Sequence, residues 1–217
     1  MPSPMSIFTI ALVVGACLLN GCATSRGVVS LATPTSDQLA TSKGIEIYIH
    51  SVVDKRIFEV APKSPNIPSL DPIEPQNDTI KLRAIARKRN TFGKGLGDIL
   101  LSEGQTVESL VHDSLRQAFI ESGYTVIENN VNTSKSSYVV DVQINKFWSW
   151  MNPGFWAITL STEIATDITV KRANEEDKKT IYVKAADNFQ TGVEGNWLSV
   201  MNSALKDYIS EVKAKFK

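Results

Sequence analysis

One uncharged apolar run near the start of the chain, residues 7–19, sets the first limit on what it can form. A helix needs about 20 apolar residues to cross a membrane, whereas the apolar part of a secretory signal needs about 7–15. The run therefore predicts a cleaved export signal and not a membrane span. No later segment is comparably apolar, so we expect the rest of the chain to form an exported domain.

The run ends in Leu19-Asn20-Gly21-Cys22, which resembles the lipobox of bacterial lipoproteins. The resemblance implies a signal peptide over residues 1–21, cleavage before Cys22 and attachment of acyl chains, palmitate among them, to that cysteine. The string departs from the usual pattern at Asn20, and the first six residues hold no Lys or Arg. Val14-Gly15-Ala16-Cys17 is a rival string, but cleavage there would leave an apolar stub on the mature chain.

The expected lipid also predicts where the protein resides. A single acyl chain holds a protein weakly, whereas the three chains that the resemblance implies would make the anchor effectively permanent. Because Ala23 and not Asp follows the cysteine, the resemblance further implies sorting to the outer membrane. The domain would then lie in the periplasm.

After Cys22 the chain divides into two parts. Residues 22–43 are rich in small and polar side chains, which predicts a flexible tether, and residues 44–217 are expected to form a single periplasmic domain. Both cysteines precede that domain, so no disulfide can form within it. A domain of this size buries roughly 70% of its unfolded surface without such a bridge.

Hydrophobic periodicity predicts the secondary structure of the domain. Apolar residues at alternate positions predict strands, and apolar residues three and four apart predict helices. The expected strands cover residues 45–53, 80–87, 124–127, 138–144, 157–172 and 180–189, and the expected helices cover residues 106–122 and 197–216, with Asn196 as the cap of the second. Five prolines between positions 62 and 75 predict a long surface loop.

These elements predict an α+β fold with a mostly antiparallel sheet of about six strands. Alternating polar residues leave one face of the sheet in water, and the two long helices pack on the other face. The helix that leads into a strand at Gly123 allows one parallel pair, which would make the sheet mixed.

The order of the elements and three short strings resemble the YajG-type family of uncharacterised bacterial lipoproteins. The strings are Val53-Asp54-Lys55-Arg56, Ser122-Gly123-Tyr124 and Val193-Glu194-Gly195. The proline-rich segment, the glycine loop after Phe92 and an aromatic hairpin depart from the family pattern. The resemblance implies no catalytic residue and no cofactor.

The sequence also gives no constellation of residues for catalysis. Its two histidines, His50 and His112, stand outside any ligand or nucleophile motif. Gly93-Lys94-Gly95-Leu96-Gly97 lacks the spacing of a phosphate-binding loop. With 23 basic and 23 acidic residues, a net charge of zero gives no support for nucleic-acid binding. We therefore expect no enzyme activity, no cofactor and no metal.

Two segments are candidates for contact with a partner or a membrane. The first is basic and holds Arg87, Lys88, Arg89 and Lys94, which could bind anionic lipid or an acidic partner. The alternative is a solvated strand end.

The second candidate is an aromatic hairpin over residues 147–156, whose turn is marked by Pro153-Gly154. Exposed tryptophan favours protein interfaces and membrane surfaces, so the hairpin is expected to form the main contact surface, with Trp148, Trp150 and Trp156 at least partly exposed. The alternative is that the rings fold back and cap the sheet. The candidate contact residues are Trp148, Trp150, Met151, Phe155 and Trp156.

The sequence thus predicts a membrane-anchored periplasmic lipoprotein that acts as a non-catalytic binding or assembly factor in the cell envelope. Its partners would be the membrane, through the N-terminal lipid, and an envelope protein. The alternative function is a carrier of lipid or of a small hydrophobic ligand, since a curved sheet under two helices can open a hydrophobic groove.

Overall fold

A computed structural model describes residues 26–36, 40–73, 76–90, 92–128 and 137–216 of the chain. The expected signal peptide, Cys22 and the rival Cys17 lie outside these residues. Among the described residues, no helix is long and apolar enough to cross a membrane.

The domain is α+β, built on one eight-stranded mixed sheet. The mixed sheet that the sequence allows is confirmed, and its longest pairs, β6 with β7 and β7 with β8, are antiparallel. The sheet has eight strands and not about six, and four of its seven strand pairs are parallel where one was allowed. The order is β1-β4-β3-β6-β2-β5, and β7 and β8 extend the sheet from the other edge of β6. The strands are β1 (Gly27–Val29), β2 (Glu46–Asp54), β3 (Ala84–Arg89), β4 (Gly95–Leu101), β5 (Thr125–Ile127), β6 (Tyr138–Pro153), β7 (Ile158–Arg172) and β8 (Glu175–Phe189).

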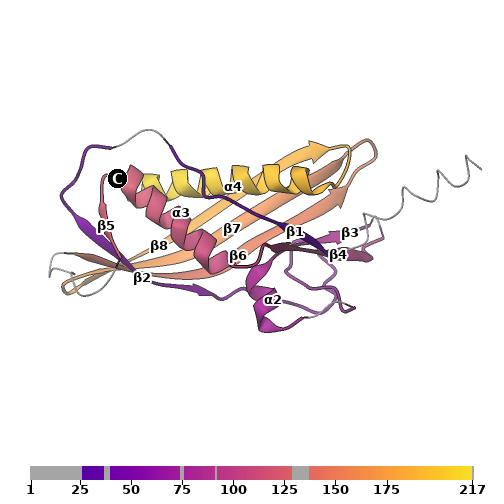
Figure 1. Ribbon diagram of the computed structural model, residues 1–217, viewed down its shortest axis with the longest axis horizontal. Coiled ribbons are helices and arrows are strands. Elements are labelled where there is room, and N and C mark those ends of the chain that lie inside the picture. The colour runs from indigo at the N-terminus through magenta and orange to yellow at the C-terminus, as the bar shows by residue number, and fades with distance from the viewer. Residues whose placement is uncertain (1–25, 37–39, 74–75, 91, 129–136, 217) are drawn as a thin grey trace, which may run out of the picture.

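Two long helices, α3 (Val107–Glu121) and α4 (Glu194–Lys215), cover one face of the sheet, as the sequence predicts (Figure 1). Thr106 and Ser109 form a reciprocal cap at the start of α3. The expected cap of α4 is wrong. Helix α4 begins after Val193, and the Asn196 side chain donates instead to the Thr191 carbonyl oxygen at 2.8 Å.

The alternation of residues 80–87 predicts a single strand, and this prediction is wrong. The first part lies in a short helix, α2 (Asp78–Arg83), because the Asn77 side chain accepts a hydrogen bond from the Ile80 amide and caps its start. Strand β3 then begins at Ala84. The part of the chain that the structure describes holds three helices in all.

Two short strands fall where none was expected. Strand β1 lies in the predicted tether and pairs in parallel with β4, and Leu31 just after it is buried. The packed domain therefore begins well before Gly44. Strand β4 begins at Gly95, in the segment that the sequence predicts to be a glycine loop. Strand β1 has only three residues, which is too few to give a periodic pattern. Strand β4 was missed because its first residues include two glycines, and glycine has low strand propensity.

The proline-rich segment packs on the sheet face opposite α3 and α4. Phe147 and Trp148 are neighbours on β6 and so point to opposite faces. Phe147 joins the core under the helices, whereas Trp148 packs with Leu70 and Phe58. The Trp148 indole donates to the Pro65 carbonyl oxygen at 3.2 Å. The domain thus has a second, smaller core at one end of the sheet.

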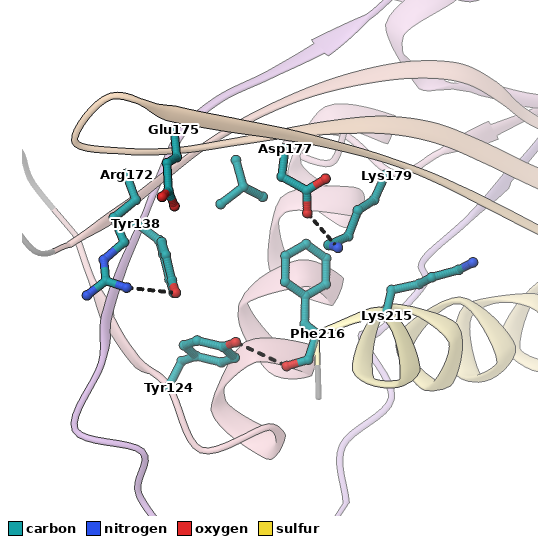
Figure 2. A pocket seen from close by; sticks show the side chains of 9 residues that line it. Tyr124, Tyr138, Arg172, Glu175, Asp177, Lys179, Lys215 and Phe216 are labelled. Carbon is teal, nitrogen blue, oxygen red and sulfur yellow. Dashed lines mark hydrogen bonds and ion pairs between the residues drawn. The ribbon is translucent and has the colours of Figure 1, made fainter.

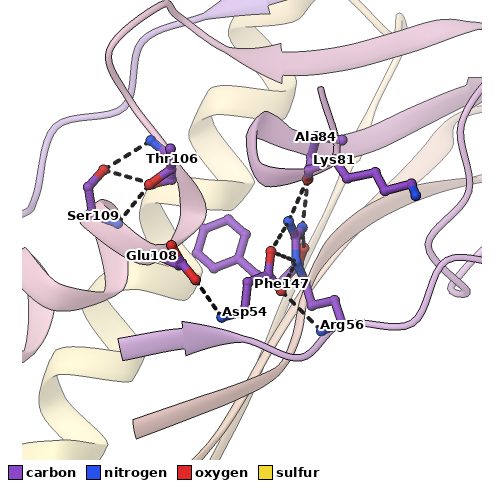
Figure 3. A network of polar contacts seen from close by, with 8 residues as sticks. All are labelled: Asp54, Arg56, Lys81, Ala84, Thr106, Glu108, Ser109 and Phe147. Carbon is purple, nitrogen blue, oxygen red and sulfur yellow. Dashed lines mark hydrogen bonds and ion pairs between the residues drawn. The ribbon is translucent and has the colours of Figure 1, made fainter. Parts of the chain in front are cut away.

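Arg56 joins three separate parts of the sheet (Figure 3). Its guanidinium binds the Asp54 carboxylate, with a shortest distance of 2.7 Å, and donates to the carbonyl oxygens of Phe147 at 2.9 Å, Ala84 at 2.6 Å and Lys81 at 2.8 Å. Along the same edge of β6, β2 pairs as far as Ile144 and β3 pairs at Ser149. The arginine therefore satisfies backbone acceptors where β6 changes neighbours.

We predict that Arg56→Met lowers the free energy of unfolding by about 3–5 kcal/mol, because it leaves the buried Asp54 charge without its partner. Arg56→Lys should also destabilise, since an ammonium group cannot match the planar geometry of the guanidinium. Urea unfolding gives the values. Arg116→Met is the control, because its ion pair with Glu128 is solvent-exposed and should contribute less than about 1 kcal/mol. Equal losses in the Arg56 and Arg116 variants would contradict the prediction.

Candidate contact surface at one end of the domain

The turn between β6 and β7 projects two aromatic rings into water. Phe155 and Trp156 are the central residues of this turn, which the Gly154 amide closes by donating to the Ala157 carbonyl oxygen at 2.9 Å. A Cβ at position 154 would lie 2.5 Å from that oxygen, so the turn needs glycine. Phe155 is 89% and Trp156 82% exposed, and their rings meet edge to face at 4.8 Å. The expected exposure is confirmed for these two residues.

The turn between β3 and β4 projects a third ring. Asn90 organises it, because its side-chain oxygen accepts from the amides of Phe92 at 3.0 Å and Lys94 at 2.9 Å. Phe92 is 94% exposed, and the Lys94 side chain is exposed beside it. Phe92 was not among the predicted contact residues. The Asn and Gly residues flanking it are a turn signal that could have indicated an exposed ring.

A cleft of about 320 Å³ lies between the β3–β4 turn, the last residues of β6 and the proline-rich segment. It is lined by Lys63 and Pro65 from that segment, by residues of the Phe92 turn, and by Met151 and Pro153 from β6. The cleft shows that segments far apart in the sequence share one end of the molecule. We call Phe92, Phe155, Trp156, Lys63 and Lys94 the aromatic end.

The expected exposure of Trp148 and Trp150 is wrong, because they are 0% and 4% exposed. Strand β6 continues to Pro153, so both lie within the strand and not in the turn. Trp148 lies in the second core, and Trp150 lies within 6 Å of the ammonium groups of Lys146 and Lys184. Met151 is only partly exposed.

The basic segment is also buried where it was expected to be exposed. Arg87, Lys88 and Arg89 are each less than 9% exposed. Arg87 and Arg89 are covered by the proline-rich segment. The Arg89 guanidinium donates to the Ser69 hydroxyl at 2.9 Å, and Arg87 lies 3.8 Å from the Asp71 carboxylate. Burial lowers the pKa of Arg89, and the charge of Arg87 lowers it further. Of the four predicted basic contacts, only Lys94 is at the surface.

A second cavity, the distal pocket, lies at the opposite end of the long strands, beside the end of α4 and the turn between β7 and β8 (Figure 2). Its volume is about 260 Å³, and the rings of Tyr124, Tyr138 and Phe216 surround it. Several of its polar groups are already paired: Tyr124 donates to the Phe216 carbonyl oxygen at 3.0 Å, and Lys179 lies 2.7 Å from Asp177.

His50, one of the two histidines, belongs to a group of polar side chains around Asp141 on the sheet. His112 lies on α3 beside Asp113. Asp141 accepts from the Ser51 hydroxyl at 2.6 Å, lies 2.7 Å from the His50 ring nitrogen and binds Lys171 at 2.9 Å. Burial raises the pKa of Asp141, but these hydrogen bonds outweigh it and hold that pKa well below its usual range. Ser51 contacts the aspartate and not the histidine, so the three do not form a nucleophile relay. Within the described ranges, no His, Cys, Asp and Glu side chains gather into a metal site.

Comparison with known proteins gives a family and a fold. The family model described as "Uncharacterized lipoprotein" matches residues 84–214, which is more than half of the chain. No curated protein sequence matches. A crystal structure of a protein from Xanthomonas campestris is 12% identical and covers 88% of this chain and 93% of its own, with a TM-score of 0.50. This likeness shows the fold alone.

Two further solved structures are similar at lower TM-scores. An uncharacterized protein is 8% identical, with a TM-score of 0.48 over 90% of this chain and 99% of its own. A hypothetical protein from Chlamydia trachomatis is 9% identical, with a TM-score of 0.42 over 82% of this chain and 96% of its own.

Substitution of a buried tryptophan and substitution of the exposed rings should differ in their effect on the free energy of unfolding. Trp148→Ala should lower the free energy of unfolding by about 3–5 kcal/mol, because it empties the second core. The double change Phe155→Ser and Trp156→Ser should alter it by less than about 0.5 kcal/mol, since both rings already face water. Urea unfolding of the two variants tests this contrast. A large loss in the double variant would mean that the exposed rings pack against the domain in solution.

Proposed function

The chain belongs to a family of uncharacterized lipoproteins, the YajG-type family that its sequence resembles, and on that premise we propose that it is a membrane-anchored, non-catalytic binding or assembly factor of the cell envelope. The observation that carries the proposal is the aromatic end. Monomeric proteins rarely keep large apolar side chains gathered in water without a binding role. Phe155 and Trp156 form such a pair, and Phe92 is exposed on the β3–β4 turn at the same end of the sheet.

The anchor in this proposal is lipid on Cys22. The family supports it, and so does the lipobox-like string that ends in that cysteine. We further propose that the signal peptide covers residues 1–21, that palmitate is among the acyl chains, and that sorting is to the outer membrane with the domain in the periplasm, as Ala23 implies. The partner would be an envelope protein or the membrane itself.

The arrangement of polar side chains supports a non-catalytic role. The most strongly perturbed carboxylate, Asp141, is held by three partners on the sheet surface and lies in neither the cleft of the aromatic end nor the distal pocket. The buried charges of Arg56 and Arg89 bind backbone and serine oxygens and so support the fold.

Packing favours this role over the alternative of a lipid carrier. The space between sheet and helices is filled by large, fully buried side chains, among them Phe119, Phe147, Trp197 and Tyr208. A carrier needs an apolar cavity, and ligand pockets usually enclose about 300–1,000 Å³ lined mainly by apolar groups. The distal pocket is smaller than that and has charged residues along its rim. The cleft of the aromatic end reaches about 320 Å³, but Lys63, Arg89 and Asn90 are among its lining residues, so it is not an apolar cavity.

Site-specific photo-crosslinking in intact cells tests the proposal. We predict that p-benzoylphenylalanine in place of Trp156 gives adducts with envelope protein or lipid several times more abundant than the same probe in place of Tyr182. Tyr182 is also exposed but lies on β8, outside the aromatic end. Equal yields at the two positions, with both proteins present at wild-type level, would overturn the aromatic end as the contact surface.

A further inference from the structure

We infer that the aromatic end rests on the surface of the same bilayer that holds the lipid anchor, so that the domain stands end-on with the distal pocket directed away from the membrane. The inference deepens the proposed function, because it rests on lipidation of Cys22. In this inference the exposed rings contact the headgroup region of the phospholipid bilayer.

The path of the chain brings the expected anchor close to the folded domain. Arg26 follows Cys22 by four residues, and four residues span at most about 14 Å. Arg26 is itself fixed in the domain, because its guanidinium binds the buried Asp98 carboxylate at 2.9 Å and β1 begins at the next residue. The tether expected over residues 22–43 therefore cannot hold the domain far from the bilayer.

The start of β1, and Arg26 with it, lies toward the aromatic end of the sheet. Gly27 pairs with Ile99 on β4, and Gly95 begins that strand four residues closer to the Phe92 turn, a separation of about 13 Å. A Cβ on Gly27 would lie 2.5 Å from the Glu194 carboxylate at the start of α4. Two residues earlier, the position of a Cβ on Gly192 would be 3.7 Å from the Met151 sulfur, which lines the cleft of the aromatic end.

The exposed groups of the aromatic end have the chemistry of a membrane contact. Aromatic side chains, and tryptophan above all, concentrate at the level of lipid headgroups. The exposed Lys63 and Lys94 can approach lipid phosphates. The exposed Glu194 carboxylate lies at the same end, so the attraction must come mainly from the rings and not from net charge. Contact with the bilayer should accordingly depend only weakly on salt.

Tryptophan fluorescence can test the inference, because all four tryptophans lie in the described part of the chain and Trp156 alone is exposed. Trp148, Trp150 and Trp197 are at most 4% exposed. The full-length lipidated protein would be reconstituted in vesicles of phosphatidylethanolamine and phosphatidylglycerol, with and without bromine on the acyl chains. We expect brominated lipid to quench the emission that Trp156 contributes, and acrylamide in the water to quench it less than in detergent.

Two variants serve as controls. Trp156→Phe keeps an aromatic ring but removes the reporter, so the quenching by brominated lipid should disappear. In that background, Tyr182→Trp places a reporter on β8, which should remain open to acrylamide and unaffected by brominated lipid. If Trp156 stays open to acrylamide and is not quenched by brominated lipid, the inference is overturned.

The outcomes also separate the inference from the proposed function. Protein adducts at position 156 in cells, without lipid quenching in vesicles, would support the aromatic end as a contact surface. They would contradict the inference that this surface contacts the bilayer. If neither adducts at position 156 in cells nor quenching in vesicles is found, both the proposed contact surface and the bilayer contact are overturned. Quenching in vesicles together with lipid adducts at position 156 in cells would support both.

Discussion

The hydrogen bonds of Arg56 are the interactions on which the two ends of the domain depend. Strand β6 is long enough to pair with β2 along its first half and with β3 farther on, along the same edge. Such a change of neighbour leaves carbonyl groups of β6 without a ladder partner, and an unpaired buried carbonyl is costly. The guanidinium supplies donors there and ties in the end of α2. The sheet can therefore continue from the β2 side to the β3–β4 hairpin that carries Phe92.

The proline-rich segment completes that end of the sheet by covering its second face. Without it, Trp148 and the arginines of β3 would face water, as their positions on alternating strands suggest. With it, Trp148 packs against Leu70, and Arg89 binds Ser69. Burial of these groups holds the β3–β4 hairpin beside the β6–β7 hairpin. The exposed rings consequently project from a supported surface and not from independent loops.

Local sequence pattern predicted the elements whose periodicity is long, and failed where burial is decided by distant segments. Helices α3 and α4 and strands β6, β7 and β8 were recognised from their spacing. Exposure of Phe155 and Trp156 followed from the adjacent turn residues. Burial of Trp150 and Arg87 could not be predicted in this way, because Lys184 of β8 lies over the Trp150 ring and a segment some twenty residues away in sequence contacts Arg87. Strand β1 was missed because only its pairing with β4 makes it a strand.

The long β6–β7 hairpin connects the two ends of the molecule mechanically. Its turn carries Phe155 and Trp156, while Tyr138 at the start of β6 and Arg172 at the end of β7 line the distal pocket. Sixteen residues of strand span roughly 50 Å. A domain that stands on the aromatic end would therefore hold the distal pocket several tens of ångströms from the bilayer. Because fifteen-residue strands paired along their full length resist bending, the height of that pocket would be set by the sheet and not by a flexible tether.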